Sequence, residues 1–361
     1  MISERNKKPR RIFRRPSGRT IIILIAILIP LAIIASYVDF PATIAFVQHY
    51  FSPHNNFTYH GHTNYVAGVV WSPDGKRIAS ASGDDTVQVW DAFTGGHVLT
   101  YRGHSSDVVT VAWSPDGKYL ASGSVDTTVQ VWNATTGQHI FTYRGHRDTV
   151  FAVAWSPDGK RVASASNDGT VQEWEASTGK RIVTYSSQIT AKGFPAPWNT
   201  VAWSPDGKRI AVGGNGDVQI WNAATGGNVA YYGYHGGTVH EVTWSADGKY
   251  IASATGNIVQ LWDIATGKNV YTYYGHSGEV FAVAWSPDGK RVASGDGDGL
   301  VLVWDALSGG HTYTYRGHAD YYPGHNTSGT NAAINSVAWS PDGKHIASAS
   351  SDSTIQVWQP L

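Results

Sequence analysis

The sequence predicts an all-β protein made of seven copies of one unit of four short strands. Three observations support this: the string WSPDGK recurs, a second tryptophan lies near the end of each copy, and turn residues cut the intervening text into short apolar runs. The spacings between copies are 42, 42, 48, 41, 41 and 54 residues, so the fourth and seventh copies follow inserted loops. The copies begin at Trp71, Trp113, Trp155, Trp203, Trp244 (as WSADGK), Trp285 and Trp339.

The recurring string is explained by a turn between the first two strands of each unit. In the copy at Trp113, Ser114 suits the first position of a type I turn, and Pro115 presets φ at the second. Gly117 then leaves the turn at the fourth position. We therefore expect a structural role for SPDG and a solvated position for Lys118.

Three landmarks recur in the same register. Gly-His opens most units, an Asp lies six residues before the second Trp in most, and VWD or LWD closes the third strand in several. From Tyr59 to the end, about 300 residues, the chain resembles the WD-repeat family. This resemblance implies a seven-bladed β-propeller, with each four-stranded sheet forming one blade around a central channel.

The two ends of the repeated region are complementary. After Trp358, in the last third strand, three residues remain, too few for a fourth strand. The text FTYHGH from Phe57 matches the fourth-strand text FTYRGH from Phe141. We therefore expect Phe57 to Tyr59 to complete the last blade, within a propeller of residues 57–361, and to leave no open sheet edge.

Most units contain a His, a Ser and an Asp, which an enzyme interpretation would treat as a hydrolytic triad. The set recurs, whereas a catalytic constellation normally occurs once, and the resemblance assigns these residues to a buried structural network. We therefore expect no catalysis; His240 with Glu241 is a weak non-repeated candidate pair. Asn215 and Gly256 replace the Asp in the fourth and fifth units. The expected network acids are Asp84, Asp126, Asp168, Asp298 and Asp352.

The front of the chain has a different composition. Residues 1–20 hold eight Lys or Arg and one acid, Glu4, and residues 21–38 are uncharged and mostly apolar. At about 1.5 Å per residue, this stretch nearly spans a hydrocarbon core of roughly 30 Å. We expect an uncleaved transmembrane signal anchor at 21–38 and a stalk at 39–56. A secretory signal peptide that is removed is the alternative.

The distribution of charge predicts an orientation. Residues 39–60 contain no Lys or Arg, so the basic segment 1–20 should stay in the cytoplasm and the propeller should lie outside, as in a membrane-anchored WD-repeat protein of bacterial type. Eight of the 27 basic residues and one of the 27 acids lie in 1–20, which leaves 19 basic and 26 acidic residues. This negative balance argues against nucleic acid as a partner.

Two inserted loops exceed the repeat. The first, from Ser186, contains Phe194 and Trp198, and the second, from Ala319, contains Tyr321 and Tyr322. Exposed loop aromatics are typical anchors for a protein partner, so we predict that these four side chains bind one. Trp198 also aligns with Val150 at the start of a first strand, and the alternative is that it belongs to the core.

One position within the repeat varies against a nearly constant background. It follows the first apolar residue of the first strand, and in the resembled family it tends to line the upper rim of the channel. Phe151, Phe281 and His240 are therefore further candidates for partner binding, with drift at an unconstrained site as the alternative. The seven residues are Ala67, Val109, Phe151, Asn199, His240, Phe281 and Asn335.

These features favour a membrane-anchored scaffold for protein–protein interaction. The alternative is an exported propeller that binds a small ligand or a cell-envelope glycan. We expect no cofactor and no metal, because GDGDG from Gly295 has no full ligand loop after it and no glycine-rich loop opens a helix.

Overall fold

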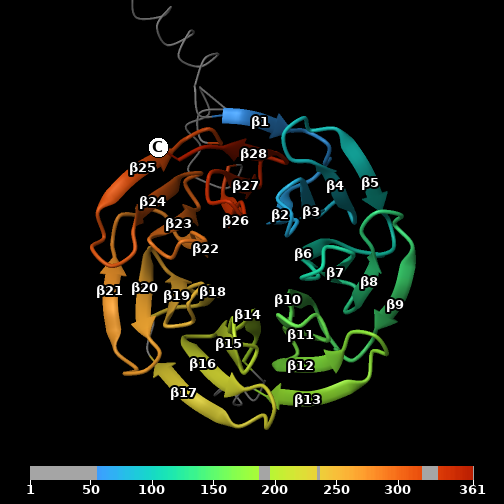
Figure 1. Ribbon diagram of the computed structural model, residues 1–361, viewed down its shortest axis with the longest axis horizontal. Helices are drawn as coiled ribbons and strands as arrows, with labels where there is room; N and C mark the ends of the chain where they lie inside the picture. Colours follow the sequence, from blue (N-terminus) through green and yellow to red (C-terminus); the bar gives the residue numbers. More distant parts are fainter. Residues whose placement is uncertain (1–54, 187–195, 234–235, 319–331, 361) are drawn as a thin grey trace, which may run out of the picture. The chain divides into compact units, whose positions relative to one another are not determined.

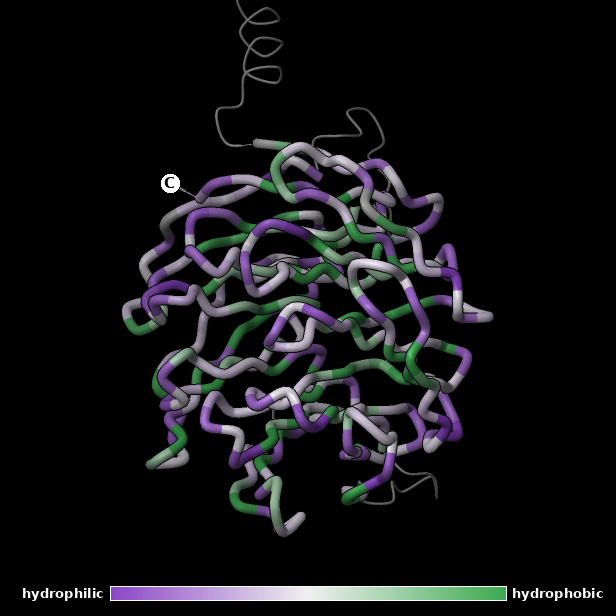
Figure 2. The backbone as a smooth tube through the Cα atoms, turned by 45° about the vertical axis from the view of Figure 1, so that its right-hand side comes forward, coloured by the Kyte–Doolittle hydropathy of each residue, from purple (hydrophilic) through white to green (hydrophobic). Residues whose placement is uncertain are grey.

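The computed structural model describes residues 55–186, 196–233, 236–318 and 332–360. Within the compact unit of residues 54–361, seven antiparallel sheets of four strands are arranged in a ring, which confirms the predicted propeller. Figure 1 shows the first strand of each blade nearest the centre and the fourth at the rim. Figure 2 shows apolar residues along the strands and a mixture of polar and apolar residues at the turns. We refer to the strands of a blade as a to d, from the centre outward.

The strands are short and regular, and their bounds follow the repeat. The a strands are β2 (Val66–Trp71), β6 (Val108–Trp113), β10 (Val150–Trp155), β14 (Trp198–Trp203), β18 (Val239–Trp244), β22 (Val280–Trp285) and β26 (Ile334–Trp339). The b strands are β3 (Arg77–Ser82), β7 (Tyr119–Ser124), β11 (Arg161–Ser166), β15 (Arg209–Gly214), β19 (Tyr250–Thr255), β23 (Arg291–Asp296) and β27 (Ile346–Ser350). The c strands are β4 (Val87–Asp91), β8 (Val129–Asn133), β12 (Thr170–Glu175), β16 (Asp217–Asn222), β20 (Ile258–Asp263), β24 (Val301–Asp305) and β28 (Ile355–Trp358). The d strands are β5 (His97–Tyr101), β9 (His139–Tyr143), β13 (Arg181–Ser186), β17 (Asn228–Gly233), β21 (Asn269–Tyr273), β25 (His311–Tyr315) and, for the last blade, β1 (Asn55–Tyr59).

The ring is closed by the strand predicted to close it. β1 pairs antiparallel with β28, and Tyr59 lies opposite Ile355. Tyr59 also contacts the first blade: its ring stacks on Trp90 at a centroid distance of 4.5 Å, and its hydroxyl donates to Gln88 Oε1 at 2.6 Å. The N-terminal strand therefore joins the last blade by backbone pairing and the first blade by packing.

The core consists of apolar side chains packed between neighbouring blades. The second Trp of a unit, such as Trp132, is fully buried, and a Tyr from the preceding d strand stacks on it; Tyr101 lies 4.5 Å from Trp132. The first Trp, such as Trp155, donates its indole N–H to a backbone carbonyl of the preceding a strand, here Ala112 at 3.2 Å. Both tryptophans therefore join blades rather than bind a partner.

The SPDG turn has the structure expected from its residues. The Gly117 N–H donates to the Ser114 carbonyl at 2.9 Å, and Gly117 has a φ of 69°, in the left-handed region that favours glycine. The Ser114 hydroxyl donates to Asp116 Oδ1 at 2.7 Å. Lys118 reaches the same carboxylate from solvent at 3.2 Å, so its position is that of a surface turn residue.

The His, Ser and Asp of the repeat form a structural network. In the second blade, His104 Nδ1 lies 2.8 Å from Asp126 and its Nε2 lies 2.9 Å from Ser122 Oγ, to which Trp132 also donates. His104 and Ser122 are buried, and the arrangement recurs in the first, third, sixth and seventh blades. The serine hydroxyl shared between His and Trp ties the connection before the a strand to the b and c strands, since buried polar groups must be paired.

The sixth blade corrects one prediction. Asp296, and not Asp298, contacts His276 Nδ1, at 2.7 Å. Asp296 ends β23 opposite Val280, where the first, second, third and seventh blades have a serine, such as Ser166 opposite Val150. The longer side chain of Asp296 reaches the histidine. Asp298 instead accepts a hydrogen bond from the Ser277 hydroxyl at 2.7 Å.

The predicted segments 1–20 and 21–38 and most of the predicted stalk at 39–56 lie outside the described residues. Within the described ranges, no helix has the length and apolar character needed to cross a membrane.

Candidate binding site at the channel mouth

Each a strand contains a β-bulge at the varied position identified in the sequence. In β10 the pairing passes from Val150 to Ala152 and skips Phe151, and the other six a strands skip the equivalent residue. A bulge re-aims its side chain away from the regular alternation of a strand. These bulged residues, here called the mouth ring, all line the central cavity: Ala67, Val109, Phe151, Asn199, His240, Phe281 and Asn335.

The most distinctive side of the mouth ring is formed by the fifth and sixth blades. His240 Nε2 lies 2.8 Å from Glu279 Oε1, and the His240 ring meets Phe281 edge-on at a centroid distance of 5.0 Å. The exposed Glu279 carboxylate orients the imidazole. The result is an aromatic and partly charged contact surface that remains accessible, since His240 and Phe281 are each only partly buried.

Two asparagines of the mouth ring join neighbouring blades. Asn199 donates its side-chain N–H to the Val239 carbonyl at 3.1 Å, and Asn335 donates to the Val66 carbonyl at 2.9 Å. Their side chains are therefore committed to the blade interfaces. The residues of the ring that offer apolar contact area at the mouth are chiefly Phe151 and Phe281.

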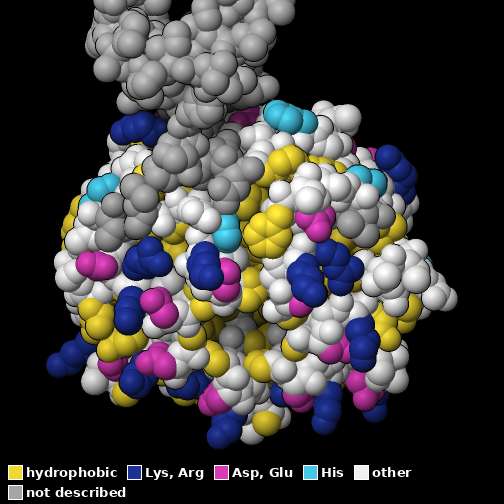
Figure 3. Space-filling model, turned by 45° about the horizontal axis from the view of Figure 1, so that its top comes forward, with side chains coloured by type: hydrophobic (Ala, Val, Ile, Leu, Met, Phe, Trp, Pro, Cys, Tyr) yellow, Lys and Arg dark blue, Asp and Glu magenta, His cyan; other side chains and the backbone are white. Residues whose placement is uncertain are grey.

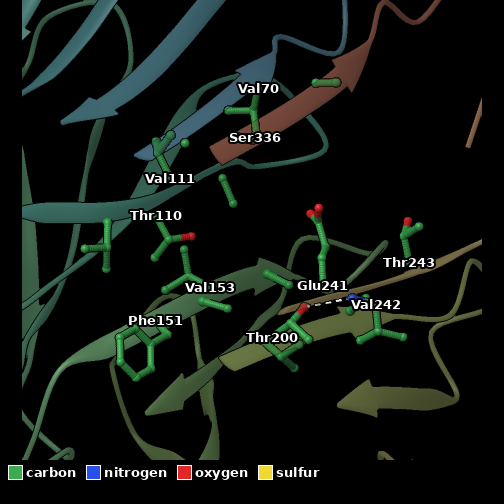
Figure 4. Close-up of a pocket in the computed structure, with 18 of the residues that line it drawn as sticks. Val70, Thr110, Val111, Phe151, Val153, Thr200, Glu241, Val242, Thr243 and Ser336 are labelled. Carbon is green, nitrogen blue, oxygen red and sulfur yellow. Dashed lines mark hydrogen bonds between the residues drawn. The ribbon is translucent and has the colours of Figure 1, made fainter. Parts of the chain in front are cut away.

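Below the mouth ring, a second set of residues faces the channel. Figure 4 shows Thr200 accepting a hydrogen bond from the Val242 N–H, at 3.2 Å, across the blade boundary. Ser336 accepts equivalently from Val69 at 3.3 Å, and Glu241 accepts from Val283 at 2.7 Å. Burial raises the pKa of the Glu241 carboxyl to about 8, opposed by the hydrogen bond from Val283.

His240 and Glu241, the weak catalytic pair named from the sequence, do not bond to each other. His240 bonds to Glu279, whereas Glu241 bonds to the backbone of β22. The position of Glu241 in the channel wall was missed by the sequence reasoning. The signal was present, because Glu241 occupies the place held by small or hydroxyl residues such as Thr200 and Ser336 in other units.

The structure contradicts the prediction that Trp198 is an exposed anchor and confirms the alternative that it belongs to the core. Trp198 is 2 % exposed, begins β14, and meets Trp221 edge-on at 5.4 Å. Gly214, opposite Trp198, leaves room for the indole, since an added Cβ would lie 2.9 Å from the Trp198 ring. Trp198 is therefore a core residue and not an exposed anchor. Phe194, Tyr321 and Tyr322 lie outside the described residues.

Charges are mixed over the propeller surface. In Figure 3, Lys and Arg side chains alternate with Asp and Glu over the face in view, and the coloured side chains form no continuous basic surface there. Phosphate backbones are bound by concentrated positive charge. This face therefore lacks the electrostatic character of a nucleic-acid site. Across the described ranges, no cluster of three His, Asp or Glu residues that could hold a metal ion is found.

A family comparison accounts for the repeated units. The family model described as WD domain, G-beta repeat matches seven successive segments. This chain belongs to the WD-repeat family. The matched segments are 53–91, 95–133, 137–175, 188–222, 228–263, 267–305 and 310–359. Such propellers are generally non-catalytic scaffolds that bind other proteins, and the match indicates no enzyme family.

Two curated proteins are similar to short stretches of this chain. Protein Mut11 of Chlamydomonas reinhardtii is 58% identical over 38 residues, which are 10% of each chain. The Notchless protein homolog of Arabidopsis thaliana is 56% identical over 34 residues, 9% of this chain and 7% of that protein. Each match covers about one repeat, so it reflects the unit rather than the function of either whole protein.

Proposed function

We propose that this WD-repeat propeller is a protein-interaction platform whose partner binds over the channel mouth. The observation that carries the proposal is the mouth ring: seven bulges present seven side chains of five different kinds, above strands that are otherwise nearly identical. Phe151 and Phe281 supply aromatic area, and His240 with Glu279 supplies a polar pair beside it. Aromatic anchors beside polar groups are typical of binding hot spots.

Affinity capture with the immobilised full chain tests this proposal. The variant Phe151→Ala with Phe281→Ala should lose the proteins that the wild type retains, whereas Ile140→Ala with Ile182→Ala should keep them. Ile140 and Ile182 are 44% and 51% exposed on outer strands, so the second variant removes similar apolar area away from the mouth. If both variants retain the same proteins, the mouth is not the interaction surface.

Phe194, Tyr321 and Tyr322 extend the same proposal. The described ends of their loops, Ser186 to Ala196 and His318 to Ala332, precede a strands and so lie on the side of the propeller where those strands begin. We propose that these aromatics contribute to the same partner. Alanine substitution of the three, tested in the same capture experiment, should weaken retention; unchanged retention would remove them from the site.

We further propose that residues 21–38 anchor the chain in a membrane, with residues 1–20 in the cytoplasm and the propeller outside. The support is the basic segment followed by eighteen uncharged residues. Protease added to intact cells should release the propeller, and the intact membrane-bound product should have a mass that includes residues 1–38. A protected propeller, or a mature product that lacks the apolar segment, would contradict the anchor.

A further inference from the structure

The channel contains one carboxylate with no counter-charge among the described residues. The cavity has a volume of about 440 Å³ and is lined by the a strands of all seven blades. His240 and Glu241 are the ionisable side chains among its lining residues, and His240 is already paired with Glu279 at the mouth. The other lining residues are mostly valines, alanines, hydroxyl residues and aromatic rings, with the amides of Asn199 and Asn335 at the mouth. A negative charge in such surroundings is costly unless a cation accompanies it.

The protein forms a hydrogen bond with one of the two oxygens of the Glu241 carboxyl. Oε2 accepts from the Val283 N–H at 2.7 Å, and no described residue bonds to Oε1. Figure 4 shows the side chain extending from its strand into the pocket. The bond to Val283 fixes the carboxyl on the wall between the fifth and sixth blades, so that one oxygen remains for a ligand in the channel.

We propose that the channel binds a primary alkylammonium group, held by an ion pair with Glu241. One free carboxylate oxygen suits the compact ammonium ion, whereas a guanidinium prefers two oxygens side by side. Thr243 lies two residues along β18 from Glu241 and lines the same cavity, and its hydroxyl is an acceptor of the kind that the remaining ammonium N–H groups need. The valine walls suit an alkyl chain. This site lies inside the channel and does not depend on the proposed binding of a protein over the mouth.

Binding should release a proton. Burial raises the pKa of Glu241 to about 8, so the empty site is protonated at neutral pH and must ionise to pair with the ammonium group. Among the strands packed against β18, β14 and β22 contain no acidic or basic residue, and β19 contributes Tyr250. β15 contributes Arg209, which lies 5.1 Å above the Trp244 ring, and β16 contributes Asp217; neither residue lines the cavity. As the pH increases towards the pKa of Glu241, the affinity for the amine should therefore rise roughly tenfold for each pH unit. Above that pKa, the affinity should level off.

Isothermal titration of the full chain with n-butylammonium chloride tests this site. We expect binding that strengthens from pH 6 to pH 8, with up to one proton released at the lower pH, as measured in buffers of different ionisation enthalpy. n-Butanol, which has the same chain without the charge, should not bind. Binding that is independent of pH, equal binding of butanol, or no binding of the amine at pH 8 would each overturn the proposal.

Glu241→Gln is the decisive variant, because the amide oxygen still accepts from Val283 while the charge is lost. It should abolish amine binding at an unchanged melting temperature, whereas Glu279→Gln at the mouth should retain it. Equal binding by Glu241→Gln would overturn the assignment. The ammonium group could belong to a free amine or to a lysine side chain of a partner, and Nα-acetyl-lysine methylamide distinguishes the two. Binding of both probes with similar affinity supports a free amine. Binding of the lysine probe at least tenfold more tightly than n-butylammonium supports a partner side chain. If neither probe binds and the mouth still retains a protein partner, the amine site is refuted and the proposed protein-interaction platform is not.

Discussion

A buried ion pair within the third blade, between β11 and β12, offers a quantitative test of the packing. Arg161 Nη1 lies 2.6 Å from Glu173 Oε1, and the Glu173 side chain has no exposed surface. The Arg161 guanidinium also lies 4.7 Å above the Trp203 ring. In the first blade, Arg77 lies 4.8 Å above Trp113 in the same way, but Val89 takes the place of Glu173. The first blade is thus a natural control for the third.

We predict that Arg161→Met costs about 3–5 kcal/mol of unfolding free energy, because it leaves Glu173 buried with the Tyr185 hydroxyl as its remaining partner. Arg77→Met should cost about 1–2 kcal/mol, because it removes one cation–π contact and the hydrogen bond to the Ala134 carbonyl. Glu173→Val should cost about 1–2 kcal/mol, because Arg161 can still stack on Trp203 as Arg77 does on Trp113, but the Tyr185 hydroxyl loses its acceptor.

The cost of Arg161→Met should also depend on pH. Burial raises the pKa of Glu173, opposed by Arg161, so removing Arg161 raises it further. An acid with a raised folded-state pKa is destabilising above that pKa, and this cost disappears as the pH falls towards the unfolded value near 4.5. Urea unfolding followed by tryptophan fluorescence at pH 5 and pH 8 should show the smaller loss at pH 5. Equal losses for the two arginine variants, or a loss above about 2 kcal/mol for Glu173→Val, would refute the reasoning.

Three further predictions follow from the fold. Trp198→Ala should lower the free energy of unfolding in urea by about 3–5 kcal/mol, because it empties a core position. A loss below about 1 kcal/mol would contradict the core position of Trp198. Burial tends to raise the pKa of Asp126, but hydrogen bonds from His104 and Thr128 hold that pKa well below its usual range. The stability that the Asp126 carboxylate gives to the fold should therefore be complete above about pH 4 and be lost at lower pH. Asp126→Asn should flatten the acid limb of a curve of unfolding free energy against pH. Removing residues 1–60 should lower the melting temperature and promote association through the freed edge of β28, whereas removing residues 1–54 should do neither; equal behaviour would contradict closure by β1.

The fold was predictable because its determinants are local and repeated. WSPDGK sets the a–b turn, and the second Trp marks the c strand. Phe57 to Tyr59 could be assigned to the last blade because their text matches that of other d strands. Agreement among seven copies makes each element easier to identify than it would be in a chain without repeats.

The candidate site was less predictable, because it depends on departures from the repeat. The varied position was correctly placed at the channel, but its cause, a bulge in every a strand, requires the strand register. Trp198 was predicted to be an anchor because the effect of Gly214, which leaves room for the indole in the core, cannot be seen in the sequence. Asp298 was predicted to join the network, but Asp296 reaches His276 instead. Glu241 could be recognised as a wall residue only once the channel was formed.

Site-specific photo-crosslinking in whole cells tests the central claim, that the channel mouth is the surface at which this propeller meets its partner. A photoreactive side chain would replace Phe281 in one variant and Ile140, on an outer strand, in the other. We expect a discrete crosslinked protein from position 281 and none from position 140. The same product from both positions, or a product from position 140 alone, would contradict the claim.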